Sequence, residues 1–165
     1  MSIITTIRVR RDERPLAYDG IVAGIIAGAV VDAFLFATGT LSWPRSYEFV
    51  ASVLVGKAAF GSSAYVLLGL AMHFAISAGW GALFGVAAQR YRRLLEHPLI
   101  TGVVFGLIVL IAMQLLLAAA GLWRAPQSAG AVFVDLLAHT VFFGMPIAWY
   151  VNDTVRQRAE PARKR

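Results

Sequence analysis

The chain has 165 residues, of which 59% are hydrophobic, and its mean hydropathy is +0.70. These values exceed those of an ordinary soluble domain, so the composition excludes that class and predicts an integral membrane protein. The formal net charge is +6, and cysteine is absent. The absence of cysteine excludes disulfides, thiolate metal sites and a cysteine nucleophile.

Four apolar stretches are long enough to cross a hydrocarbon core, which takes about 20 helical residues. The first stretch could also be read as a cleaved signal peptide, because a basic segment precedes it and residues 37–39 resemble a cleavage site. We favour a membrane span there, because its acidic residue and spaced glycines suit packing against other helices. The predicted fold class is an all-α membrane protein with four transmembrane helices in two hairpins, forming a single domain. The expected spans are 20–39, 64–86, 98–122 and 130–151.

The distribution of Lys and Arg predicts the orientation of these helices. Twelve of the fifteen lie in the tails 1–17 and 152–165 or in the loop 89–97, and only Arg45, Lys57 and Arg124 lie on the other side. Because positive charge favours the cytoplasmic side, both termini are expected in the cytoplasm. A bacterial cytoplasmic membrane is the expected location, since the N-terminal sequence has no organelle signal. The basic tails contain no interleaved aromatic residues for base stacking, so nucleic acid is not an expected partner.

The loop between the first two spans, residues 40–63, carries its own helical pattern. Pro44 and Ser46 can start a helix, and the apolar residues that follow recur at helical spacing: Phe49, Val50, Val53, Leu54 and Ala58. Glu48, Ser52 and Lys57 remain for the polar side. We expect a short interfacial helix here, acting as an anchored connector or as a lid over the outer mouth of the bundle.

The two hairpins resemble each other in sequence. At one constant offset along the chain, three positions of the first span align with three of the third: Gly20, Gly24 and Asp32 with Gly102, Gly106 and Gln114. At a second, smaller offset, His73 of the second span aligns with His139 of the fourth. A duplicated hairpin is therefore one interpretation, and chance alignment of common membrane residues is the other.

Small residues recur on the spans at about one-turn spacing. In lipid, such residues let helix backbones approach closely and mark helix contacts. Those contacts could lie within the chain or between copies, so a homodimer is an expected partner besides the lipid bilayer. The residues expected to pack are Gly20, Gly24, Gly28, Gly81, Gly85, Gly102 and Gly106.

Two aspartates, two histidines and one glutamine lie inside the predicted spans, where an ionised carboxylate costs about 2.5–3.5 kcal/mol on insertion scales. Such residues normally face the interior of a bundle, and Asp135 lies one turn from His139 on the same helix. We therefore expect one polar cluster in the outer half of the bundle. Its members are Asp32, His73, Gln114, Asp135 and His139.

Three functions remain open for this cluster. The first is structural: the polar groups pair across helices and fix their packing, giving a structural or assembly role. The second is proton- or ion-linked transport, because Asp and His exchange protons and Pro146 is expected to break the fourth helix near Phe142. The third is a haem- or metal-binding redox site, with His73 and His139 as axial ligands of haem b.

Enzyme signatures are missing from the sequence. It contains no phosphate-binding glycine loop, no His-Glu-x-x-His motif and no nucleophile elbow. We therefore do not expect an enzyme, and no residue is assigned a catalytic role.

Overall fold

The computed structural model describes residues 15–40, 42–123, 125 and 128–159, and this part of the chain contains helices and no strands. In these described ranges, six α-helices are connected by short loops, by two 3₁₀ turns and by one π-helical turn. The 3₁₀ turns are η1 (Gly56–Ala59) and η2 (Arg92–Leu95), and the π turn is η3 (Thr140–Gly144). The α-helices are α1 (Leu16–Ala37), α2 (Arg45–Val55), α3 (Ser63–Arg90), α4 (Pro98–Ala119), α5 (Ala129–His139) and α6 (Met145–Ala159).

Within the described residues, four helices are long and apolar enough to cross a membrane, as the sequence predicted. They are α1, α3, α4 and the continuous helix Ala129–Ala159, which consists of α5, η3 and α6. The first begins at Leu16 and the last continues to Ala159, so helix extends into both of the predicted tails. The basic residues at 8–14 and 163–165 lie outside the described residues. Hydropathy underestimates these lengths because polar end turns keep their backbone hydrogen bonds after the apolar run ends.

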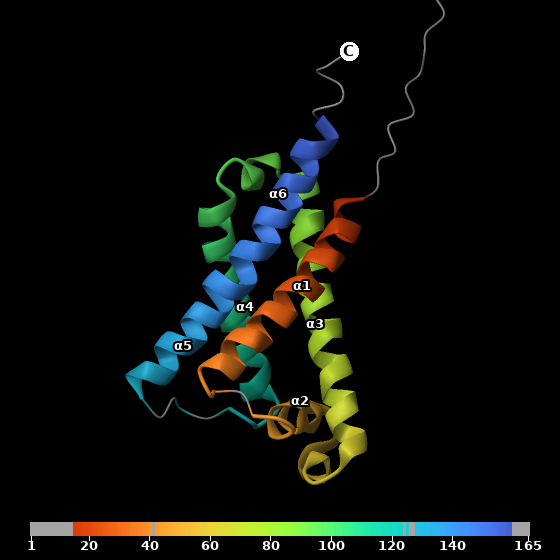
Figure 1. The fold of residues 1–165 in the computed structure, drawn as a ribbon, viewed down its shortest axis with the longest axis vertical. Coiled ribbons are helices and arrows are strands. Elements are labelled where there is room, and N and C mark those ends of the chain that lie inside the picture. Colours follow the sequence, from red (N-terminus) through yellow and green to blue (C-terminus); the bar gives the residue numbers. More distant parts are fainter. Residues whose placement is uncertain (1–14, 41, 124, 126–127, 160–165) are drawn as a thin grey trace, which may run out of the picture.

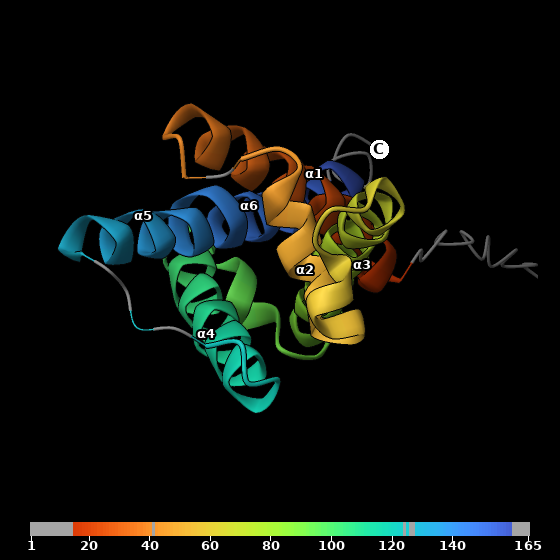
Figure 2. The same ribbon diagram turned by 90° about the horizontal axis from the view of Figure 1, so that it is seen from below.

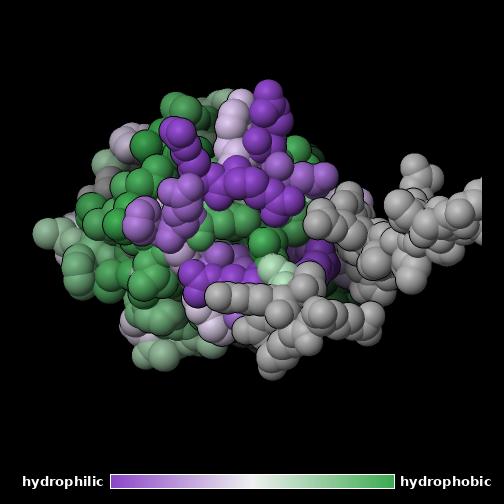
Figure 3. Space-filling model, turned by 90° about the horizontal axis from the view of Figure 1, so that it is seen from above, coloured by the Kyte–Doolittle hydropathy of each residue, from purple (hydrophilic) through white to green (hydrophobic). Residues whose placement is uncertain are grey.

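The helices pack as two pairs that meet in the middle of the bundle. α1 packs against α3, α4 packs against α6 and η3, and α1 also contacts α6. Figure 2 shows the continuous α5–α6 helix between α1 and α4. The start of α1 and the end of α6 lie at the same end of the bundle, which we call the termini end, and α2 lies near the opposite end, the α2 end (Figure 1). Polar residues gather on the termini end, with hydrophobic residues around them (Figure 3).

Glycine lets α1 and α3 touch backbone to backbone. A Cβ atom added to Gly20 would collide with the backbone of Gly81, and one added to Gly24 would collide with the backbone of Ser77. Gly85 lies equally close to the backbone of Leu16. Such close approach increases the van der Waals contact that holds helices together in lipid.

The glycines of the second hairpin make the same kind of contact. Gly102 packs on the backbone of Gly144 and Met145, and Gly106 packs on the backbone of His139 and Thr140. The predicted packing glycines of both hairpins therefore pack against other helices of the same chain. A homodimer would have to use another surface.

The contacts of Gly81 and Gly144 define how the two hairpins correspond. Gly81 meets the carbonyl oxygen of Gly20 and the amide nitrogen of Gly24, and Gly144 meets the same atoms of Gly102 and Gly106. The first helices of the hairpins therefore correspond as the sequence predicted. In the second helices, Gly81 corresponds to Gly144.

On the other side of the π turn the correspondence shifts by one position. Gly24 packs on Ser77 as Gly106 packs on His139, so Ser77 corresponds to His139. The second hairpin thus has one more residue between these two contacts than the first hairpin has. The π turn η3 accommodates this residue, since a π turn holds one more residue than an α turn. The same register equates His73 with Asp135. The alignment of His73 with His139 is therefore wrong by one helical turn.

The fourth span widens at Pro146 and does not break. Thr140–Gly144 forms the π turn, and Pro146 lies in the first turn of α6 directly after it. Proline lacks the amide hydrogen that an α-helix needs at this point, and a π turn accommodates the lost bond without ending the helix. The expected break near Phe142 is therefore corrected to a local widening.

The loop helix α2 is present, but its polar side faces the protein. Glu48 and Ser52 were expected to face water, yet they are 6% and 3% exposed, while Phe49 and Leu54 are exposed. α2 packs on α3, where the backbone of Tyr47 lies against Gly69. The polar side chains of α2 are therefore positioned to interact with the bundle.

Candidate functional site

Asp32 of α1 joins three helices at the α2 end of the bundle. The hydroxyl of Tyr47 on α2 donates a hydrogen bond of 2.8 Å to Oδ2 of Asp32. Nε2 of His73 on α3 lies 3.2 Å from Oδ1 of Asp32 and 3.4 Å from the carbonyl oxygen of Gly28. Both neighbours of this nitrogen are acceptors, so Nε2 carries the proton. Both carboxylate oxygens of Asp32 are therefore occupied, and the residue is 8% exposed.

Burial raises the pKa of Tyr47 above its usual value, and the hydrogen bond to Asp32 and the charge of Asp32 raise it further. The phenol therefore remains the donor in this bond. We expect the alkaline absorbance difference between the wild type and Tyr47→Phe to stay small near pH 10, where an ordinary tyrosine is half ionised, because the raised pKa keeps Tyr47 more protonated. A full tyrosinate contribution from Tyr47 in that difference spectrum would contradict the hydrogen bond.

The second polar group lies between α4 and α5. Nε2 of Gln114 donates a hydrogen bond of 3.0 Å to Oδ2 of Asp135. Nδ1 of His139 lies 3.1 Å from Oδ1 of Asp135 and 2.9 Å from its backbone carbonyl oxygen. The Asp135 side chain is 41% exposed, compared with 12% for Asp32. The second group is thus the more open of the two.

The structure places the five predicted polar residues in two groups, one in each hairpin. In the first, Asp32 pairs with His73; in the second, Gln114 pairs with Asp135. These are corresponding positions in the repeat defined by the glycine contacts. The repeat therefore preserves a polar bridge between its two helices, although the residue types differ.

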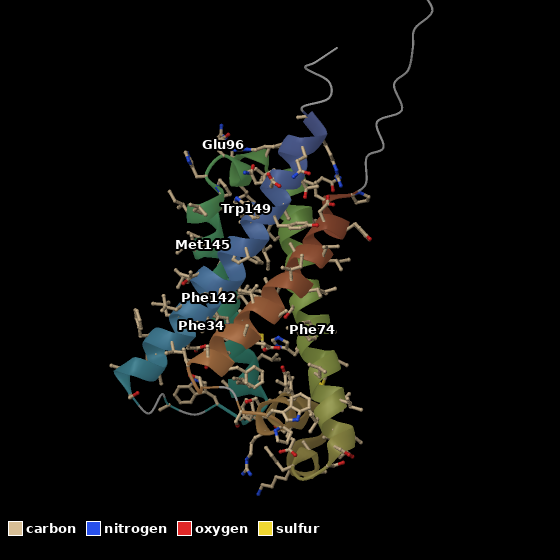
Figure 4. All side chains as sticks on the ribbon, in the orientation of Figure 1. Phe34, Phe74, Glu96, Phe142, Met145 and Trp149 are labelled. Carbon is tan, nitrogen blue, oxygen red and sulfur yellow. The ribbon has the colours of Figure 1, made fainter. Side chains whose placement is uncertain are left out.

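A small cavity separates the two groups. Its volume is about 90 Å³, and both His73 and His139 line it, together with mostly apolar residues that include Trp80, Val109 and Met113. This space holds on the order of three water molecules at about 30 Å³ each. Elsewhere between the hairpins, Phe34 of α1 stacks on Phe142 of η3 with ring centroids 4.0 Å apart (Figure 4).

The cavity does not suit the proposed haem. A site for a ligand of that size is typically at least about 300 Å³. No group of three or more His, Cys, Asp and Glu side chains able to hold a metal occurs among the described residues.

One buried charge pair escaped the sequence analysis. At the termini end, Asp19 of α1 is 6% exposed, and one of its carboxylate oxygens lies 2.8 Å from a guanidinium nitrogen of Arg158 on α6. The pair links the first and last helices across 139 positions of the chain. An acidic residue in the first turn of a span was the available signal, since burying it requires a cationic partner.

Comparison with protein-family models, with curated proteins and with solved structures finds no match for this chain. Its fold and polar groups define the class no further than a four-span helical membrane protein.

Proposed function

We propose that this protein has a structural or assembly role in the membrane and that its polar groups hold its helices together. The observation that carries the proposal is the use of both carboxylate oxygens of Asp32 within the chain, one for α2 and one for α3. A carboxylate used in this way connects three helices of the same chain, as polar groups that fix helix packing do. Gln114 and Asp135 bridge α4 and α5 in the same manner.

The proposed setting is a bacterial cytoplasmic membrane, with both termini in the cytoplasm and α2 at the outer interface. Twelve Lys and Arg residues on the termini side, against three on the other, support this orientation. The exposed side chains of Phe49 and Leu54 on α2 suit the boundary between headgroups and acyl chains.

Proton-linked transport is the second candidate. It is favoured by one observation: His73 and His139, each beside a carboxylate, line the same cavity from different hairpins. Imidazole and carboxylate groups around a small water-sized space are the elements of a proton relay.

Flux measurements in liposomes separate the two functions. Under the structural proposal, vesicles containing the wild type should show proton flux no higher than protein-free vesicles when a potential is applied. Flux that disappears in His73→Ala and Asp32→Asn, while the loop variant His97→Ala retains it, would establish transport and overturn the structural proposal. All variants should first be shown to remain folded by circular dichroism.

A further inference from the structure

A second cavity lies at the α2 end, outside the polar groups described above. Its volume is about 500 Å³, and it lies between the start of α2 and the start of α3. This volume is typical of a small-molecule site, for which about 300–1,000 Å³ is usual. Its lining includes Trp43, Glu48, Gly61, Val66 and Leu67.

Glu48 is the one ionisable side chain among those that line this cavity. The residue is 6% exposed, and the amide of Gly61 donates a hydrogen bond of 2.9 Å to Oε1. No salt bridge to Glu48 occurs among the described residues. The neighbouring cation Arg45 packs over the ring of Phe60, with Cζ 5.9 Å from the ring centroid. A buried carboxylate without a counter-charge favours binding of a cation.

The other lining residues indicate what kind of cation fits. Trp43 is 59% exposed, and an aromatic ring beside a carboxylate suits an organic ammonium group, which binds the ring face. Val66 is buried and Leu67 is 65% exposed, so an apolar surface extends from the cavity along the outside of α3. A divalent metal ion fits poorly, because Ca²⁺ and Mg²⁺ require several oxygen ligands.

We propose that the cavity binds an organic ammonium group carried on an apolar chain. The ammonium group lies between the Glu48 carboxylate and the Trp43 ring, and the chain follows Val66 and Leu67 along α3. An amine-bearing lipid headgroup and a free amphiphilic amine share this chemistry. The proposal is independent of the role assigned to Asp32.

Two binding experiments distinguish a membrane lipid from a free amine as the source of the ammonium group. In the first, the full chain is reconstituted in nanodiscs with equal amounts of phosphatidylethanolamine and phosphatidylglycerol, and native mass spectrometry measures the lipid that stays bound. A lipid source predicts that the ethanolamine lipid is retained at least about tenfold more than the glycerol lipid. In the second, calorimetry in maltoside micelles measures binding of butyltrimethylammonium, and a free amine source predicts saturable binding in this experiment alone.

Glu48→Gln tests the site in both experiments. The amide still accepts the hydrogen bond from Gly61 but lacks the negative charge. The preference for the ethanolamine lipid, or the affinity for butyltrimethylammonium, should therefore fall at least about tenfold. Trp43→Leu, at an exposed position, provides a second variant should Glu48→Gln fail to fold, and a similar loss is expected. The control is Glu96→Gln, which removes a carboxylate near the termini end and should bind as the wild type does.

Retention of the ethanolamine lipid that depends on Glu48 supports a lipid ligand, and binding of the soluble probe alone supports a free amine. The proposal is overturned by a preference for phosphatidylglycerol or by the absence of binding in both experiments. Binding that is unchanged in both Glu48→Gln and Trp43→Leu also overturns it.

Discussion

Replacing Gly81 with alanine should destabilise the bundle by about 3 kcal/mol, the upper end of the usual cost of overpacking, because the new methyl group has no space. The added Cβ would collide with the carbonyl oxygen of Gly20 and would lie 2.8 Å from the amide nitrogen of Gly24. Both are backbone atoms, which cannot rotate away as a side chain can. α1 and α3 would have to separate along their whole contact.

Gly79 provides a matched control on the same helix. A Cβ added there has no neighbouring atom within 4 Å. Gly79→Ala should therefore leave stability unchanged or raise it by up to about 1 kcal/mol through better helix propensity. The propensity gain applies equally to Gly81→Ala, so the difference between the two variants isolates the contact with α1.

Unfolding of the purified protein by SDS titration in mixed micelles, followed by circular dichroism, measures both variants. Gly144→Ala should resemble Gly81→Ala, because Gly144 holds the corresponding place against Gly102 and Gly106. Equal stability of Gly79→Ala and Gly81→Ala would show that the close approach of α1 and α3 is not part of the folded state.

The sequence was sufficient to predict the features that depend on local pattern. Four membrane-length helices follow from apolar run length, and the packing glycines follow from their spacing of about one turn. The pairing of Asp135 with His139 follows from their i, i+4 separation on one helix. In each case the signal lies within a single helix.

The register of the repeat could not be derived in this way. The aligned pair His73 and His139 suggested a register one turn away from the observed one, because the packing of α5 on α4 depends on where Gly106 meets its partner helix. The π turn then adds one position before Gly144. Register between helices depends on tertiary contacts, which a single sequence does not report.

Tyr47 shows a second limit of prediction from the sequence. The sequence pattern around it indicates no partner for its hydroxyl, because only the docking of α2 on α3 brings that hydroxyl to Asp32. Glu48 and Ser52 were placed on the water side for the same reason: amphipathic pattern predicts two faces but not which surface each one meets. The Asp19–Arg158 pair likewise depends on the contact between α1 and α6.

Asp32→Ala should lower the free energy of unfolding by about 2–3 kcal/mol, because it leaves both the Tyr47 hydroxyl and the His73 imidazole without their carboxylate partner. Asp135→Ala should cost no more than about 1 kcal/mol, since its side chain is 41% exposed and His139 keeps its contact with the backbone carbonyl oxygen of position 135. SDS titration measures both changes, and an equal cost for the two variants would contradict the difference in burial.

A double-mutant cycle with Tyr47→Phe shows whether Asp32 holds α2 in place. Tyr47→Phe should cost about 1 kcal/mol in the wild type and almost nothing in Asp32→Ala, because the hydrogen bond is already absent there.

The contact between Tyr47 and Asp32 also controls protease access to the end of α2. Lys57 follows α2 in the turn Gly56–Ala59 and is exposed. Trypsin should therefore cleave after Lys57 faster in Asp32→Ala than in Asp135→Ala. Equal cleavage, with no coupling in the cycle, would mean that α2 is held by Gly69 and its backbone contact with Tyr47 alone.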